Sequence, residues 1–304
     1  MKLVFLGTPE FAVPSLERIV ADGHEVLAVF TQPDRPKGRG HQVSMPPVKQ
    51  AALRFGLPVF QPERVRTPEV AAQLRALAPE AMVVVGYGQI IPQSILDIPP
   101  LGIVNVHASL LPRYRGAGPV QWAIANGEKT TGVTTMRIDA GLDTGDVLLK
   151  QEVAIGEEET APELAAKLAV FGAEILGKTL ATLRQLTGEK QDTHRATYAP
   201  ILKREDGHVD WSRPAREILN RIRGFQPWPG CYGFRRGQRL HIWKARPAEL
   251  ELKPGELSAR GRQLFAGCGE GAIELVEVQA EGKKRMSAAD FLNGAQIEAG
   301  ERLE

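Results

Sequence analysis

An asparagine and a histidine lie two residues apart at the end of a short apolar segment. Residues 103–106 read Ile-Val-Asn-Val, and His107 follows them directly. Side chains at positions i and i+2 of a strand lie on the same face, so we expect Asn105 and His107 to point the same way. A single histidine is usually structural, but a carboxamide donor beside a titratable ring is typical of a functional site. The pair therefore predicts such a site at the C-terminal end of this strand.

Three carboxylates follow in a glycine-rich turn. Asp139, Asp143 and Asp146 all lie within residues 139–146. A calcium loop is one interpretation, but the spacing does not match the EF-hand pattern and no closing glutamate follows at the right place. A solvated hairpin is the second interpretation. The third is that one carboxylate turns inward and orients His107.

The elements that must position these groups alternate in type. Continuous apolar segments at 3–6, 26–30, 82–86 and 103–106 are separated by segments of helical spacing, among them 15–21 and 70–78. Continuous apolar strands separated by helices indicate a parallel sheet that is covered on both faces. The pattern predicts an α/β N-terminal domain with a doubly wound, mostly parallel, Rossmann-like sheet. Ligands of such sheets bind beyond the C-terminal ends of the strands.

The pattern changes in the second half of the chain. Strands are predicted at 130–138 and 147–153, a long helix at 161–186, a helix at 215–223, and short strands at 232–234, 240–243, 263–266 and 273–278. Many short strands with glycine turns predict a small OB-like β-barrel as C-terminal domain. We therefore expect the α/β domain at 1–189, a polar linker at 190–208 and the barrel at 209–304.

Composition excludes several classes of protein. The 304 residues are 43% hydrophobic and 24% charged, as in an ordinary globular protein. Two cysteines, Cys231 and Cys268, without a CxxC motif or a His-Cys cluster, exclude a disulfide framework and a zinc site. The most apolar stretch, 82–92, is too short to cross a bilayer, and no signal peptide precedes the first strand. We expect a cytoplasmic enzyme or nucleic-acid-binding protein with no membrane partner.

The turn after the first strand also excludes a function. Gly7-Thr8-Pro9 is not a GxGxxG motif, and Pro9 removes a backbone N–H that a phosphate would use. No acidic residue ends the second strand to hold a ribose. Both features argue against a dinucleotide site.

Charge is distributed unevenly along the chain. The net charge is only +2, but Lys203–Arg246 holds 11 basic and 4 acidic residues, while Pro247–Glu304 holds 7 basic and 11 acidic ones. Such a basic segment is either a solvated face or a surface that binds a polyanion.

Five segments of the sequence carry a specific resemblance. NVHASLLPRYRGAGPVQWAI and GLDTGD are similar to the formyltransferases that use 10-formyltetrahydrofolate. FLGTPEFAVPSLE, TQPDRPKGRG and HVDWSRPAREILNRIRGFQPWPG resemble the members of that family that act on initiator methionyl-tRNA. The resemblance runs over essentially the whole chain, although beyond Lys244 it holds only by residue type.

The resemblance implies a reaction and a catalytic trio. The methionine amino group attacks the formyl carbon of 10-formyltetrahydrofolate, and the family's trio corresponds to Asn105, His107 and Asp143. Asn105 then donates to the oxyanion of the tetrahedral intermediate. His107 either donates to the same oxygen or takes a proton from the attacking nitrogen, and Asp143 orients it. No metal and no nucleophilic serine or cysteine are required.

Two binding surfaces are implied as well. The folate site is expected at Ser109, Leu110, Leu111, Pro112, Tyr87, Gly88, Gln89 and Ile90. The tRNA surface is expected at Arg35, Lys37 and Arg39 in a basic loop, and at Arg221, Arg223, Arg235 and Arg236 in the basic segment. We interpret the nearby Trp211, Phe225 and Trp228 as core or interface aromatics rather than stacking platforms, and we expect a monomer because no heptads are present.

Three other functions compete with this interpretation. A related folate formyltransferase acting on a small ribonucleotide or an amino-sugar nucleotide would keep the trio but would not need the basic loop or a basic barrel. A non-catalytic RNA-binding module is opposed by the intact trio. A nucleotide-binding oxidoreductase is opposed by the missing GxGxxG motif.

Overall fold

The computed structural model describes residues 1–37 and 42–304, which divide into two compact units. The first unit comprises Met1–Gly116, Thr130–Ala154 and Ala165–Tyr198. The second comprises Ala117–Lys129, Ile155–Leu164 and Ala199–Glu304. The chain therefore passes between the units several times before it enters the C-terminal third.

The first unit is built on a seven-stranded sheet with the order β10-β9-β7-β6-β1-β2-β5. Its strands are β1 (Lys2–Gly7), β2 (Glu25–Phe30), β5 (Val59–Phe60), β6 (Ala81–Val85), β7 (Ile103–His107), β9 (Thr130–Arg137) and β10 (Val147–Ala154). The five strands from β5 to β7 pair in parallel, and β9 and β10 add an antiparallel edge. This confirms the mostly parallel sheet that the apolar segments predict.

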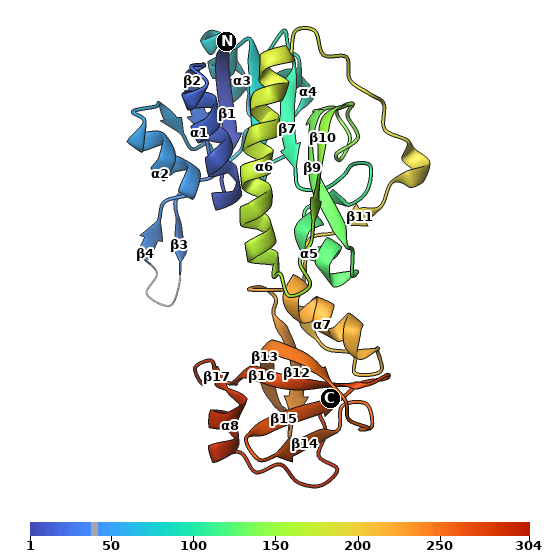
Figure 1. The fold of residues 1–304 in the computed structure, drawn as a ribbon. Coiled ribbons are helices and arrows are strands. Elements are labelled where there is room, and N and C mark those ends of the chain that lie inside the picture. The colour runs from blue at the N-terminus through green and yellow to red at the C-terminus, as the bar shows by residue number, and fades with distance from the viewer. Residues whose placement is uncertain (38–41) are drawn as a thin grey trace. The chain divides into compact units, whose positions relative to one another are not determined.

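Helices cover both faces of this sheet (Figure 1). One face packs against α1 (Val13–Ala21), α2 (Pro47–Arg54) and α6 (Ala161–Thr182), and the other against α3 (Pro68–Leu77) and α4 (Gln93–Leu96). The arrangement is a doubly wound α/β layer structure, as the sequence predicts. The long helix ends at Thr182, four residues earlier than its apolar spacing suggests.

Strand β7 shows why the strands of this sheet are apolar along their length and where polar residues begin. Val104 and Val106 belong to the core beneath α1 and α6, whereas Ile103 belongs to the core on the opposite face. A strand that is buried on both faces needs apolar residues at every position. Asn105 and His107 break this rule on the face of Ile103, at the C-terminal end of the strand.

The second unit contains a small antiparallel sheet and three α-helices of its own. It contains α5 (Pro119–Ala125), α7 (Ala215–Gly224), β12 (Cys231–Arg235), β13 (Gln238–Ala248), β14 (Leu257–Arg260), β15 (Gln263–Gly267), β16 (Ala272–Ala280), β17 (Met286–Ser287) and α8 (Ala288–Gly294). Its six strands follow the order β12-β13-β16-β15-β14, with β17 on β16. Strand β14 was missed by the sequence analysis, and β13 is longer than predicted.

The C-terminal residues close this sheet. Leu303 bridges Arg235 of β12, and Arg302 bridges Glu256 beside β14, so one short segment joins the two edges of the sheet. Its backbone also exchanges hydrogen bonds with Phe234 and donates to Gly255. Closure removes open strand edges, which gives the small barrel that the glycine-punctuated strands predict.

The aromatic residues near the barrel do not all behave as expected. Trp211 and Phe225 are buried in the core of the second unit, as predicted. Trp228 is 55% exposed, so the expectation of a core residue is wrong for it. Trp228 lies between Pro227 and Pro229 in the turn that follows α7.

The remaining elements are short. They are β3 (Arg35–Lys37), β4 (Gln42–Ser44), β8 (Arg115–Gly116), β11 (Tyr198–Ala199) and three 3₁₀ turns at Glu10–Ala12, Thr193–Arg195 and Arg204–Gly207. Strands β3 and β4 pair in antiparallel orientation on either side of residues 38–41, which belong to the predicted basic loop and lie outside the described residues. Among the helices in the described part of the chain, none combines the length and apolarity that a bilayer crossing requires.

Candidate active site

His107 ends strand β7 and faces an acceptor at each ring nitrogen. Its Nε2 lies 2.9 Å from the carbonyl oxygen of Tyr114, and its Nδ1 lies 3.7 Å from Oδ2 of Asp143. A carbonyl oxygen only accepts hydrogen bonds, so Nε2 carries a proton. The ring is almost buried, with 8% of its side chain exposed. Water therefore screens the carboxylate only weakly.

Asp143 lies in the turn between β9 and β10 and points to His107. Its Oδ2 accepts a hydrogen bond of 2.8 Å from the backbone N–H of Gly116, and 16% of its side chain is exposed. Asp139 is exposed and accepts bonds from Gly141 and Thr144 within its own turn. Of the three carboxylates in this turn, Asp143 is the one that meets the histidine. This geometry favours the third of the interpretations that the sequence left open.

Asn105 lies on the same face of β7 as His107 and is 9% exposed. Its backbone is fixed between β6 and β9, opposite Val84 and Met136. Among the described residues, no hydrogen-bond partner is recorded for its carboxamide. The amide is therefore available to donate to a bound group beside the histidine.

The segment after His107, predicted to bind folate, is held by buried hydroxyls. Ser109 donates to the carbonyl of Arg113 at 2.6 Å, and Thr134 donates to the carbonyl of Ser109 at 2.6 Å. Thr134 also accepts from the N–H of Leu111 at 3.2 Å. Leu111 is 1% exposed and packs in a small apolar cluster, while Leu110 and Pro112 are partly exposed. The segment is thus rigid, with two apolar side chains partly at its surface.

The second predicted folate segment, residues 87–90, follows β6 at the point where the sheet order reverses. The chain runs outward from β1 to β2 and β5 and then returns to β6 on the other side of β1. Thr8, after β1, donates to the carbonyl of Tyr87 at 3.1 Å, and Gln32, after β2, donates to it at 3.0 Å. Ligands of doubly wound sheets bind at such a reversal. The position of this segment suits a ligand site.

The side chains of this segment divide into two kinds. Tyr87 is 1% exposed, and burial raises the pKa of its hydroxyl to about 12. Gln89 uses its amide to accept from the N–H of Val65 at 2.7 Å. Ile90, by contrast, is 86% exposed, and Gly88 adopts a φ of +84°. Tyr87 and Gln89 therefore hold the segment, and Ile90 is the side chain that it presents.

The residues predicted to bind tRNA differ in how available their charges are. Arg35 is exposed on β3, Lys37 ends that strand, and Arg39 lies outside the described residues. Arg221 lies over the ring of Phe225, 5.6 Å from its centroid. Arg223 donates to the carbonyls of Gly156 and Glu159, and burial lowers the pKa of its guanidinium.

Arg235 and Arg236 are engaged by acidic groups near the C-terminus. Arg235 lies 2.8 Å from Glu301, and Arg236 lies 2.9 Å from the same carboxylate and 2.7 Å from Glu298. Two carboxylates therefore offset two of the charges that the basic segment contributes. Only 16% of the Arg235 side chain is exposed, against 51% for Arg236.

Some residues near the trio were not found by sequence reasoning. Tyr114 contributes only a backbone carbonyl, which any residue carries, so its type gave no signal. Arg115 is 2% exposed and bonds to Gln191, which lies in the segment predicted as a linker. A buried arginine reveals itself only when its environment is known.

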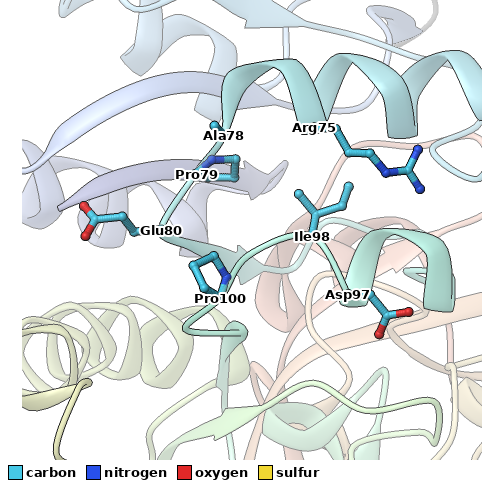
Figure 2. Close-up of a pocket in the computed structure, with 7 residues that line it drawn as sticks. All are labelled: Arg75, Ala78, Pro79, Glu80, Asp97, Ile98 and Pro100. Atoms are coloured by element: carbon cyan, nitrogen blue, oxygen red, sulfur yellow. The ribbon is translucent and has the colours of Figure 1, made fainter.

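Two cavities lie away from the sheet edge that carries the trio. A cavity of about 400 Å³ lies at the N-terminal ends of β6 and β7, between Arg75, Glu80 and Asp97 (Figure 2). A second, of about 660 Å³, lies in the second unit between the start of α7 and β16. None of the predicted trio or folate residues lines either cavity. Within the described residues, no three His, Cys, Asp or Glu side chains are grouped as metal ligands.

Known proteins share this chain's sequence over both units. Residues 1–180 match the formyl transferase family, and residues 201–296 match the formyl transferase C-terminal domain. The chain is 61% identical to the methionyl-tRNA formyltransferase of Solibacter usitatus and 56% identical to that of Koribacter versatilis. Each match covers 100% of this chain and 98% of the relative.

A solved structure shares the fold. The N-formyltransferase of Helicobacter canadensis, in complex with folinic acid and dTDP-3-aminofucose, superposes with a TM-score of 0.69 at 20% identity. The superposition covers 92% of this chain and 99% of that one.

The chain therefore belongs to the formyl transferase family, which confirms the resemblance found in its motifs. Within that family, methionyl-tRNA formyltransferases match the whole chain at 50% to 61% identity.

Proposed function

We propose that this protein transfers the formyl group of 10-formyltetrahydrofolate to the amino group of methionine on initiator methionyl-tRNA. The observation that carries the proposal is full-length identity of up to 61% to methionyl-tRNA formyltransferases, without large gaps in coverage of either chain. The geometry at the end of β7 supplies groups that such an acyl transfer needs. The product, formylmethionyl-tRNA, serves translation initiation, so we place the reaction in the cytoplasm.

Each member of the trio has a role that follows from its position. The folate donor supplies the formyl group, whose carbonyl oxygen becomes negative as the amine adds to it. Asn105 offers an amide N–H to that oxygen, because its carboxamide has no partner among the described residues. Preorganised donors of this kind stabilise an oxyanion without reorganising during the reaction.

His107 is the group that we assign to proton transfer. The attacking amine must lose a proton as its bond to the formyl carbon forms, and the departing folate nitrogen must gain one as its bond breaks. The Tyr114 carbonyl lies 2.9 Å from Nε2, and Oδ2 of Asp143 faces Nδ1 at 3.7 Å. This arrangement fits both roles that the resemblance implies, proton donor to the oxyanion and general base for the amine. Asp143 orients the ring in either role.

The substrates would occupy the edge of the sheet around this trio. We place the folate against residues 109–112 and 87–90, because both segments flank the C-terminal ends of the strands and Ile90 offers an exposed apolar surface. We place the tRNA on Arg35, Lys37 and Arg39 and on the C-terminal domain, residues 209–304, which carries most of the basic segment Lys203–Arg246. Among its predicted arginines, we expect Arg221 to contribute most, since its guanidinium contacts the ring of Phe225, whereas Arg223 binds carbonyls and Arg235 and Arg236 pair with carboxylates. We take the active form to be a monomer.

An assay with competing acceptors tests the function. Purified protein and 10-formyltetrahydrofolate are offered initiator methionyl-tRNA, glycinamide ribonucleotide or a dTDP-amino sugar in parallel, and formyl transfer is measured for each. We expect transfer to methionyl-tRNA alone. Transfer to a small acceptor with none to methionyl-tRNA would establish the alternative, a folate formyltransferase for small substrates.

A further inference from the structure

The segment Gln191–Thr197 contacts the catalytic loops at several points. The carboxamide of Gln191 donates through Nε2 to the carbonyl of Asp143 at 2.9 Å and to that of Gly145 at 2.7 Å. Its Oε1 accepts from Nε and Nη2 of Arg115 at 3.1 and 2.7 Å. Guanidinium only donates and carbonyl only accepts, so these partners fix which end of the amide faces which loop. All hydrogen-bonding positions of this one amide are used.

The two loops joined by Gln191 meet at the Asp143 carboxylate. Gly116, the neighbour of Arg115, donates its N–H to Oδ2 of Asp143. Gln191 thus binds the backbone carbonyl of Asp143 directly. It also binds Arg115, whose neighbour Gly116 donates to the Asp143 carboxylate. Arg115 is 2% exposed, and a buried guanidinium needs such partners. The loop has little slack, because a Cβ at Gly145 would overlap the carbonyl of Arg137.

Thr197, at the other end of the segment, holds the second acceptor of His107. Its hydroxyl accepts from the N–H of Tyr114 at 2.8 Å, and its carbonyl accepts from the N–H of Arg115 at 2.8 Å. The carbonyl of Tyr114 is the group that lies 2.9 Å from His107 Nε2. The segment Gln191–Thr197 therefore supports both groups that face the His107 ring, the Tyr114 carbonyl and the Asp143 carboxylate.

Backbone strain at these two positions shows why support is needed. Tyr114 has a φ of +58° and Asp143 a φ of +53°, both in the left-handed region that favours glycine. A strained residue of this kind costs of order 1–3 kcal/mol and persists where surrounding contacts over-determine it. At Asp143 and Tyr114 those contacts include Gln191 and Thr197. Both strained residues present an acceptor to His107.

We propose that Gln191 is a positioning residue that sets the Asp143 carboxylate against His107 by binding the backbone of the Asp143 turn. It hydrogen-bonds to Arg115, Asp143 and Gly145, so it acts on His107 through Asp143. The kinetic test of this assignment rests on the proposed formyl transfer. The hydrogen bonds that position Asp143 do not depend on which acceptor the enzyme uses.

A double-mutant cycle tests this assignment. Gln191→Glu keeps an acceptor for Arg115 but places an oxygen against the carbonyls of Asp143 and Gly145. We expect kcat to fall between about 10- and 100-fold, the range for loss of a supporting contact or a small misplacement of a reacting group. The KM values for both substrates should change little. In an Asp143→Asn background the same change should lower kcat less than twofold, because the carboxylate it positions is already gone. Exposed Gln185, mutated to Glu, is the matched control and should leave kcat unchanged.

A spectroscopic measurement separates this inference from the proposed function. The ring ¹⁵N signals of His107 are recorded in the unliganded protein, where no acceptor is involved. Gln191→Glu and Asp143→Asn should both move the Nδ1 signal, and Gln185→Glu should not. Moved signals in a protein that fails to formylate methionyl-tRNA would refute the proposed function and leave the positioning role standing.

Two results would overturn the positioning role. One is an equal fall in kcat for Gln191→Glu in the wild-type and Asp143→Asn backgrounds, which indicates a general structural effect. The other is a His107 spectrum that Asp143→Asn changes and Gln191→Glu does not. If thermal unfolding shows that the Glu variant does not fold, Gln191→Asn, which keeps the neutral amide on a shorter side chain, enters the same cycle with the same expectations.

Discussion

The Asp143 turn and the basic segment Lys203–Arg246 use their charges in opposite ways. In the turn, neighbouring groups hold the backbone so that one carboxylate is left to face His107. In the basic segment, Arg235 and Arg236 face carboxylates of the same unit, and Arg223 binds carbonyls. The number of charges in a sequence therefore says little about how many are available. What decides is whether a charge faces a group of the site, as Asp143 faces His107, or is paired with an opposite charge of its own unit.

The largest expected effect comes from the uncharged member of the trio. Asn105→Ala removes the amide that we assign to the oxyanion, and kcat should fall about 10²- to 10³-fold, the usual effect of losing one such donor. Binding of the folate, measured by calorimetry, should change little, because the interaction strengthens only as the oxygen becomes negative. A small loss of kcat with a large loss of folate affinity would instead make Asn105 a ground-state binding residue.

Asp143→Asn should follow, and it tests the turn directly. The variant keeps the shape and removes the charge that faces His107, so kcat should fall at least about 100-fold, as for loss of acid–base catalysis. Asp139→Asn and Asp146→Asn are matched changes in the same turn and should be milder in steady-state kinetics. Equal, small effects at all three positions would mean that Asp143 is an ordinary surface carboxylate.

A smaller effect should distinguish Arg221, which lies over an aromatic ring, from Arg236, which pairs with carboxylates. Arg221→Ala should weaken tRNA binding by about 1 kcal/mol or more and lower the slope of log K against log salt by about one, as expected for a phosphate contact. Arg236→Ala removes the same charge at a position held by Glu298 and Glu301, and it should change affinity less than twofold. Filter binding over a salt series measures both. Identical losses would show that the ion pairs of Arg236 open when tRNA binds.

The local sequence pattern was sufficient to predict the strands and helices that position the trio. The period of two along β7 predicted that Asn105 and His107 share a face, and the continuous apolar segments predicted the parallel sheet. Asp143 could be chosen from three carboxylates only through the resemblance to known formyltransferases. The sequence showed the excess of basic residues in the segment Lys203–Arg246, but it did not show which carboxylates and carbonyls those residues bind.

What sequence reasoning missed depends on contacts between distant residues. Gln191 lies 48 residues from Asp143 and 76 from Arg115, and it lies in a polar segment that is typical of a linker. Glu301 lies more than 60 residues from the arginines it pairs with. Tyr114 acts through a carbonyl that every residue has. Such contacts are set by the tertiary fold, and no local pattern encodes them.

The position of α5 in the chain has a consequence for exchanging parts between relatives. This helix lies between β8 and β9 in sequence, but Trp122 packs edge-on against Phe225 at 5.2 Å, and Gly224 has no room for a Cβ beside Gln121 and Ala125. A chimera made with a single crossover near residue 200 would join a barrel from one parent to an α5 from the other. Recombinants should therefore retain function more often when residues 117–129 and 199–304 come from the same parent, which makes two distant gene segments a single unit of inheritance.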